Sequence, residues 1–349
     1  MNPFLGVVLH AIGGFSSASF YVPVHKVRRW AWETYWVTLG FVAWVVMPQI
    51  GGWLTTPDLW AILRQSPGRN LTWCYLFGAL WGVGGLTCGL SLRYLGLSLG
   101  QTLSLGFCAA FGTLIPPIFE GTAGELVATV SGQYVLAGIA VCLAGICLCG
   151  YAGVLKEKQL TDAQKKEAIK DFALLKGFAV ATFGGIMSAC MAFAIKAGAP
   201  IAQAALHAGT EKVFSNNPTY VLAMGGGFTT NFIAAMILNA RNRSFGDYVV
   251  SPRRILLSNY LLAVLSGSMW YGQFFFYGMG TTKMGRYDFA SWSIHMAFII
   301  VFSNLWGIYL REWKLVDRRT QIVLWAGIIT LIASTILIGY GNSLAASKA

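Results

Sequence analysis

Apolar residues along this chain gather into long runs that short polar joints separate. A helix needs about 20 mainly apolar residues to cross the hydrocarbon core of a bilayer. Because backbone polar groups inside lipid must bond within their own segment, such runs are expected to be helical. The pattern predicts an all-α polytopic membrane protein with ten transmembrane helices, near residues 4–24, 35–53, 73–92, 97–119, 132–152, 176–195, 219–239, 255–280, 287–310 and 321–341.

Composition agrees with this pattern and excludes a soluble enzyme. The 349 residues are 56% hydrophobic and 11% charged, whereas soluble domains carry roughly a quarter charged residues. The net charge of +12 comes from short joints rather than from a basic soluble face, so nucleic acid is not an expected partner. The seven cysteines lie in or beside apolar runs without a C-x-x-C pair, which indicates neither a metal site nor a disulfide framework.

Positive charge predicts the orientation of the chain. Of the 25 Lys and Arg residues, 18 lie in the joints that follow the first, third, fifth, seventh and ninth helices, with Arg93 and Lys176 counted as edges of their joints. The positive-inside rule places these odd-numbered joints in the cytoplasm and both termini outside.

The one long charged segment divides the chain into two halves. Residues 1–154 hold the first five predicted helices, 155–175 form a cytoplasmic linker, and 176–349 hold the last five. Within the linker, "TDAQKKEAIKDF" begins with Thr161 and has Gln164 three residues later, a capping-box pattern that predicts a short helix. Because each half has an odd number of spans, the halves would form a five-plus-five inverted repeat, which is common in secondary transporters.

Polar side chains recur on one face of several predicted helices. Buried polar groups are costly in hydrocarbon, and those that persist there usually face a cavity or the bundle interior. We expect these faces to line one hydrated pocket. The residues at spacings of 3, 4 and 7 are His10, Gly14, Ser17 and Tyr21; Ser266, Trp270, Gln273 and Tyr277; and Asp288, Trp292 and His295, with Trp81, Gly85 and Cys88 in the third helix and Asn231 in the seventh.

Aromatic rings beside amides suit a sugar, because a pyranose has apolar C–H faces and a hydroxyl edge that needs donors and acceptors. Membrane-buried carboxylates and histidines are candidates for carrying a coupling proton. Other roles stay open. Trp270 and Trp292 could pack or lie at the interface, Gln273 could bond between helices, Asp288 could cap a helix, and Glu33 could lock a joint at the membrane edge.

Several segments of the chain resemble the L-rhamnose–proton symporter family of the drug/metabolite transporter superfamily. They are "YVPVHKVRRWAWETYW", "LWGVGGLTCGLSLRYLGLSLG", "MGGGFTTNF", "MWYGQFFFYGMG" and "YDFASWSIHMAF…LREW", in that order over nearly the whole chain. The resemblance implies ten helices in a five-plus-five inverted repeat and uptake of L-rhamnose with protons across the bacterial inner membrane. Positions that match the family's motifs are His10, Tyr21, Lys26, Trp30, Trp32 and Glu33; Trp81, Arg93, Tyr94 and Gly96; and Asn231, Trp270, Tyr271, Gln273, Tyr287, Asp288, Trp292 and His295.

The third helix departs from the family's pattern. Residues 84–88, "GGLTC", are less polar than the resemblance implies, and Gln101 stands where an aliphatic residue is expected. If these positions contact the sugar, the substrate would be a related deoxy-sugar or a pentose.

These observations predict a deoxyhexose–proton symporter of the inner membrane that works by alternating access. The expected partners are a sugar, protons and the lipid bilayer, with no cofactor and no metal. An exporter of another small metabolite is the alternative; an intramembrane enzyme is not expected, since H-E-x-x-H and G-x-S-x-G are absent from the sequence. The predicted substrate-binding residues are Tyr21, Trp81, Gln101, Asn231, Trp270, Gln273, Tyr277 and Trp292, and the predicted proton-coupling residues are Asp288, His295, His10 and Glu33.

Overall fold

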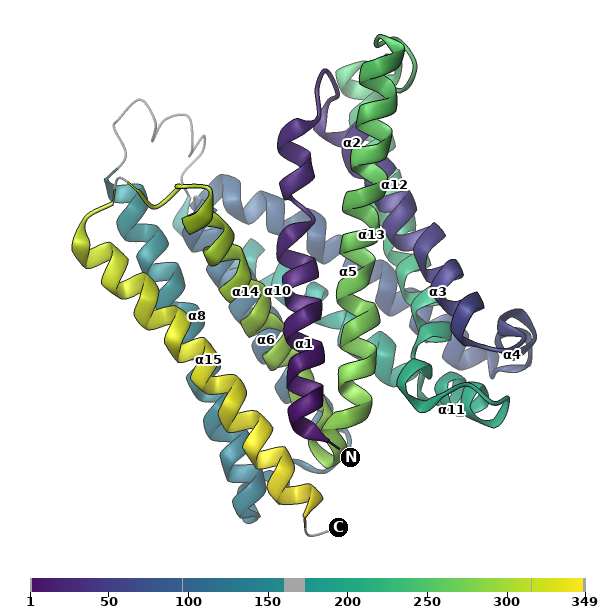
Figure 1. The fold of residues 1–349 in the computed structure, drawn as a ribbon, viewed down its shortest axis with the longest axis vertical. Helices are drawn as coiled ribbons and strands as arrows, with labels where there is room; N and C mark the ends of the chain where they lie inside the picture. Colours follow the sequence, from purple (N-terminus) through teal and green to yellow (C-terminus); the bar gives the residue numbers. More distant parts are fainter. Residues whose placement is uncertain (1, 96, 160–172, 315, 348–349) are drawn as a thin grey trace. The chain divides into compact units, whose positions relative to one another are not determined.

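The computed structural model describes residues 2–95, 97–159, 173–314 and 316–347, and regular structure in these parts is helical throughout (Figure 1). The prediction of an all-α protein is confirmed. The main helices are α1 (Pro3–Ser19), α2 (Trp32–Phe41), α3 (Met47–Thr55), α5 (Gly68–Leu95), α6 (Leu97–Phe119), α8 (Val130–Lys158), α10 (Leu174–Ala197), α12 (Asn217–Asn242), α13 (Arg253–Met284), α14 (Ser291–Tyr309) and α15 (Arg318–Ala346). Short helices and turns join them: α4 (Leu59–Gln65), α7 (Ala123–Ala128), α11 (Ala199–His207), the 3₁₀ turns η1 (Val22–Lys26), η3 (Lys212–Phe214), η4 (Phe245–Tyr248) and η5 (Gly285–Ala290), and the π-turn η2 (Val42–Val46).

Nine segments of the described chain are long and apolar enough to cross a membrane. One of them, Arg253–Tyr309, contains both α13 and α14, and another, Trp32–Thr55, contains α2, η2 and α3. The prediction of a multi-pass membrane protein is therefore confirmed, while ten spans and an inverted repeat stay predictions. The short helix expected around Thr161 falls in 160–172, outside the described residues.

The chain forms two compact units. Unit 1 comprises Met1–Phe15, Gly84–Ala192 and Met279–Ala349, and unit 2 comprises Ser16–Val83 and Phe193–Gly278. Both units draw on both predicted halves of the sequence. The chain passes from one unit to the other inside α1, α5, α10 and α13 rather than in loops.

In unit 1, α8 and α15 lie side by side along their length (Figure 1). Glycines make this approach possible. A Cβ built on Gly145 would lie 2.8 Å from Leu331 Cγ, and one on Gly327 would lie 2.8 Å from the backbone nitrogen of Cys149. Without water to drive helices together, close van der Waals packing at small residues holds membrane helices to one another.

In unit 2, α5 and α12 approach through their backbones. A Cβ built on Gly78 would lie 1.9 Å from the carbonyl oxygen of Ala223, and one on Gly226 would lie 2.1 Å from that of Tyr75. A substituent at either position meets backbone, which cannot turn aside as a side chain can.

Gly78→Ala is therefore expected to destabilise the protein by about 1–3 kcal/mol, the usual cost of overpacking. The measurement is thermal unfolding in detergent. Gly85→Ala is the matched control, because Gly85 lies in the same helix and a Cβ there meets nothing within 4 Å. Gly85→Ala is expected to leave stability unchanged or raise it by up to about 1 kcal/mol. Equal melting temperatures for the two variants would contradict this account of the contact.

The second span contains a π-turn next to a proline. Pro48 has no N–H to donate to the carbonyl four residues earlier, and the Met47 N–H instead bonds the Val42 carbonyl five residues back. Such wide turns often occur at functional sites. Trp44, in the middle of η2, is buried.

Candidate functional site

Unit 2 contains a cluster of aromatic rings from three spans. The Trp81 and Trp270 ring centroids are 5.4 Å apart, and Trp44 lies 5.3 Å from Trp270 and 6.0 Å from Trp81. Phe274, one turn after Trp270 on α13, lies 5.4 Å from it and 6.1 Å from Trp81. These distances are typical of edge-to-face and offset aromatic pairs. Of the predicted sugar contacts, Trp81 and Trp270 are thus brought together.

Buried polar atoms without a partner lie on η2, α12 and α13. Among the described residues, Trp44 Nε1, Tyr220 OH and Tyr271 OH have no hydrogen bond. Gln273 is only 5% exposed, and its amide has no hydrogen bond to the described part of the chain. Burying an unsatisfied donor or acceptor costs about 1–3 kcal/mol, so the Trp44, Tyr220 and Tyr271 groups are suited to receive a polar ligand. Tyr277 is also buried, with its ring 6.3 Å from Phe274.

Asn231 has its polar atoms engaged within the protein. Its Oδ1 accepts from Trp36 Nε1 at 3.0 Å, and its Nδ2 donates to the Gly227 carbonyl at 2.9 Å. This arrangement fixes the Trp36 ring beside α12. The role of Trp36 is absent from the sequence prediction, because an interfacial tryptophan and a bridging one look the same in sequence.

Two other predicted residues lie near the ends of their helices. The buried Glu33 carboxylate accepts from Ser244 Oγ at 2.7 Å and from Asn242 Nδ2 at 3.0 Å, and so ties the start of α2 to the end of α12. Tyr21 follows α1 and is about half exposed.

In unit 1, the two histidines predicted to take part in proton coupling face each other. Both rings are fully buried, and their centroids are 6.3 Å apart with an interplanar angle of 62°. His10 also packs against Gly280, where a Cβ would lie 2.7 Å from the imidazole. Trp292, one turn before His295 on α14, donates from Nε1 to the Cys108 carbonyl of α6 at 3.1 Å.

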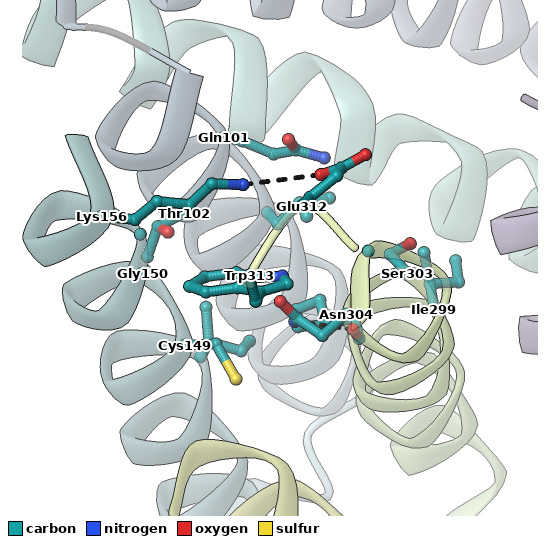
Figure 2. A pocket seen from close by; sticks show the side chains of 15 residues that line it. Gln101, Thr102, Cys149, Gly150, Lys156, Ile299, Ser303, Asn304, Glu312 and Trp313 are labelled. Carbon is teal, nitrogen blue, oxygen red and sulfur yellow. Dashed lines mark hydrogen bonds and ion pairs between the residues drawn. The ribbon is translucent and has the colours of Figure 1, made fainter. Parts of the chain in front are cut away.

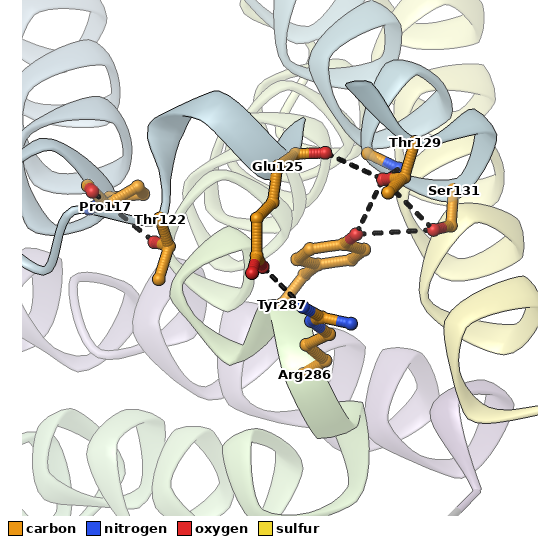
Figure 3. A network of polar contacts seen from close by, with 8 residues as sticks. Pro117, Thr122, Glu125, Thr129, Ser131, Arg286 and Tyr287 are labelled. Carbon is orange, nitrogen blue, oxygen red and sulfur yellow. Dashed lines mark hydrogen bonds and ion pairs between the residues drawn. The ribbon is translucent and has the colours of Figure 1, made fainter. Parts of the chain in front are cut away.

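Asp288 lies in η5, the turn between α13 and α14. The preceding residue, Tyr287, has non-helical backbone angles (φ −105°, ψ 46°). Figure 3 shows the surroundings of this turn: the Tyr287 hydroxyl lies 3.0 Å from Thr129 Oγ1 and 3.2 Å from Ser131 Oγ, and Arg286 pairs with Glu125. The turn that carries Asp288 is thus attached to the start of α8.

Unit 1 also has a cavity of about 180 Å³ with a mixed polar and apolar lining (Figure 2). At one wall, Lys156 Nζ lies 3.5 Å from a Glu312 oxygen and 4.6 Å from the centre of the Trp313 ring. This volume is sufficient for several waters or one small solute. Its polar and aromatic lining consists of Gln101, Thr102, Ser303, Asn304, Lys156, Glu312 and Trp313.

Of the predicted site residues, Gln101 lines this cavity. The rest of the lining is absent from the sequence prediction, yet the signal is present: continuing the Trp292–His295 face by steps of four reaches Ile299 and Ser303, and both line the cavity. Glu312 and Trp313 belong to a joint, where charge and tryptophan are expected for reasons of topology alone.

Comparison with known proteins agrees with the sequence resemblance. The model of the L-rhamnose-proton symport protein family matches residues 2–345. Proteins named L-rhamnose-proton symporter from Cronobacter sakazakii and Salmonella paratyphi B are each 38% identical over 340 residues, which cover 97% of this chain and 97% of each relative. The prediction that the chain is a transporter and not an enzyme is thereby confirmed. The chain belongs to the L-rhamnose-proton symport protein family.

Proposed function

We propose that this chain takes up L-rhamnose, or a closely related deoxy-sugar, together with protons across the bacterial inner membrane by alternating access. The family match over nearly the whole chain is the observation that carries this proposal. The exporter alternative finds no support in the comparisons. As a multi-pass protein of a symporter family, the chain resides in the inner membrane.

Ten spans fit the geometry of the 57-residue segment Arg253–Tyr309. At 1.5 Å per residue a helix of that length would be about 85 Å long, far more than the ~30 Å of a hydrocarbon core. The non-helical Tyr287 in η5 divides the segment. Two crossings in this segment would give five spans in each half, which is what an inverted repeat requires.

Contacts between joints support the proposal that odd-numbered joints lie on one side of the membrane and even-numbered joints on the other. In unit 1, Lys156 after the fifth span pairs with Glu312 after the ninth. An apolar cluster in unit 1 includes Leu126 from the joint after the fourth span and Met284 from the joint after the eighth. It also includes Ile338, Val7 and Ala345, which lie near the two chain ends. Odd-numbered joints thus meet each other, and even-numbered joints meet each other and the termini.

Unit 2 repeats this separation. The Arg28 N–H after the first span bonds Asn259 at the start of the eighth, whereas Asn217 before the seventh bonds Thr55 at the end of the second. With most positive charge at the odd-numbered joints, the positive-inside rule favours both termini in the periplasm.

For the sugar, we propose that Trp81, Trp270 and Tyr277 contact its apolar faces and that Gln273 bonds its hydroxyls. The unpartnered Tyr220 hydroxyl and the 5% exposed Gln273 side chain support this assignment, because a polyol supplies both donors and acceptors. Asn231 would act by holding Trp36. Gln101, which lines the unit 1 cavity, stays a proposed contact from the sequence alone. Tyr21 and Trp292 stay proposed contacts from the family resemblance.

For the proton, we propose Asp288 together with His295 or His10. Two imidazoles buried 6.3 Å apart in membrane helices are costly and suit a proton relay. Glu33 has two hydrogen-bond donors on its carboxylate and is proposed as a lesser contributor.

Proteoliposomes of the purified protein are expected to accumulate labelled L-rhamnose when the outside is more acidic than the inside. A gradient of one pH unit supplies about 1.4 kcal/mol per proton, enough for up to about tenfold accumulation. A protonophore should abolish it, and unlabelled deoxyhexoses and pentoses, added in turn, rank the specificity. If sugar uptake does not depend on the pH gradient, the symport proposal is wrong. If sugar moves in the direction opposite to the protons, the exporter alternative is correct.

A further inference from the structure

Unit 2 carries a strongly basic cavity that the proposed transport function does not use. It has a volume of about 660 Å³. Three of its lining residues are Lys or Arg and a fourth is His, and none of the described residues that line it is acidic. They are His25, Lys26, Arg28 and Arg254, with Ile255, Ser258 and Asn259 completing the wall.

Hydrogen bonds hold the backbone of the segment that carries His25, Lys26 and Arg28. Asn259, buried on α13, accepts from the Arg28 N–H at 3.2 Å and donates to the Arg28 carbonyl at 2.7 Å. Three residues later the Ala31 N–H bonds Asp247 Oδ2 at 2.6 Å. The backbone between the first and second spans is therefore attached to the start of α13, and Lys26 and Arg28 on this backbone line the cavity.

An exposed apolar face continues from the cavity along α13. Leu257, Leu261 and Leu265 are 61%, 60% and 51% exposed. Steps of three and four residues put them on the helix face that carries Arg254 and Ser258. A ligand that fills the basic cavity is thus next to a row of exposed leucines on the same helix.

We propose that this cavity binds the phosphodiester headgroup of an anionic phospholipid, with its acyl chains along the exposed leucines of α13. Basic pockets at the surface of membrane helices favour anionic lipid headgroups, and each nearby Lys or Arg strengthens binding. A free phosphate has the same charge chemistry but no use for the leucine face. The proposal requires that the start of α13 lies at a membrane surface, and it holds for either leaflet.

The test uses the full-length protein purified in a neutral detergent. Binding of dioctanoyl-phosphatidylglycerol, dioctanoyl-phosphatidylcholine and inorganic phosphate is measured by thermophoresis. We expect saturable phosphatidylglycerol binding that is at least about tenfold tighter than that of either other probe. Equal binding of phosphatidylcholine, or of inorganic phosphate alone, would overturn the proposal without need of any variant.

Variants then place the lipid. Lys26→Gln with Arg254→Gln is expected to weaken phosphatidylglycerol binding about tenfold or more, whereas Lys26→Arg with Arg254→Lys should retain it. The matched control, Arg241→Gln with Arg253→Gln, removes the same charge from exposed residues outside the cavity. If the first pair fails to fold, Arg254→Gln alone serves, with an expected loss of about threefold. Equal loss in the cavity and control variants would show that overall charge, rather than this site, holds the lipid.

Discussion

Gln273→Met is expected to weaken L-rhamnose binding by about tenfold and, in the same protein, to leave the thermal stability of the sugar-free state unchanged or slightly raised. Methionine keeps the volume of glutamine and removes both polar atoms. The lost hydrogen bonds to sugar are worth about 0.5–1.5 kcal/mol each, and 1.4 kcal/mol is a factor of ten. In the empty protein the Gln273 side chain is 5% exposed, and no hydrogen bond joins its amide to the described residues, so its removal should leave stability unchanged or raise it by up to about 1 kcal/mol.

A loss of sugar affinity without a loss of stability distinguishes a sugar contact from a structural bridge. Sugar affinity is measured by tryptophan fluorescence or calorimetry, and stability by thermal unfolding in the same detergent. Gln133→Met is the control, since Gln133 is an exposed helical glutamine whose amide donates to the Val127 carbonyl at 2.9 Å. If Gln273→Met lowers stability and leaves sugar affinity intact, the side chain bonds between helices and the proposed assignment is wrong.

Asp288→Asn is expected to abolish proton-driven accumulation while sugar exchange continues. Asparagine has nearly the same shape but cannot take up or release a proton. At a gradient of one pH unit the accumulation ratio should therefore fall from up to about ten to about one. Counterflow, in which labelled sugar enters against unlabelled sugar inside the vesicle, needs no net proton movement and should persist.

Asp58→Asn is the matched control, because Asp58 is exposed before α4 in a left-handed conformation (φ 46°) that asparagine tolerates. It should leave accumulation intact. Accumulation retained by Asp288→Asn together with a lower melting temperature would identify Asp288 as a helix cap, the other role that its position before α14 allows.

The membrane spans could be predicted from the sequence because lipid permits few solutions. A run such as 132–152 has to be helical in hydrocarbon, and α8 covers it from Val130 to Lys158. The family could be identified because many short matches in order add up, although each is common alone. Interruptions inside the spans could not be predicted from hydropathy. The π-turn η2 divides the second predicted run through a local change of hydrogen bonding that leaves hydropathy unchanged.

Partners of individual side chains could not be predicted. Spacing gives the face on which a residue lies but not what packs opposite it. Asn231 and Gln273 are both amides in apolar spans, yet one is bonded to Trp36 and Gly227 while the other has no partner in the described chain. The Trp313 wall of the cavity comes from a joint, and that joint meets Lys156 only through tertiary structure.

The wide turn at Val42–Val46 constrains chain length in the second span. Each residue of an α-helix rotates the chain by about 100°. Deleting one residue between Val42 and Pro48 would turn everything before it by that angle. Glu33 would then point away from Ser244, and Trp36 away from Asn231. Insertions and deletions should therefore be rarer here in natural homologues than in the surrounding loops, even where the residue types themselves vary.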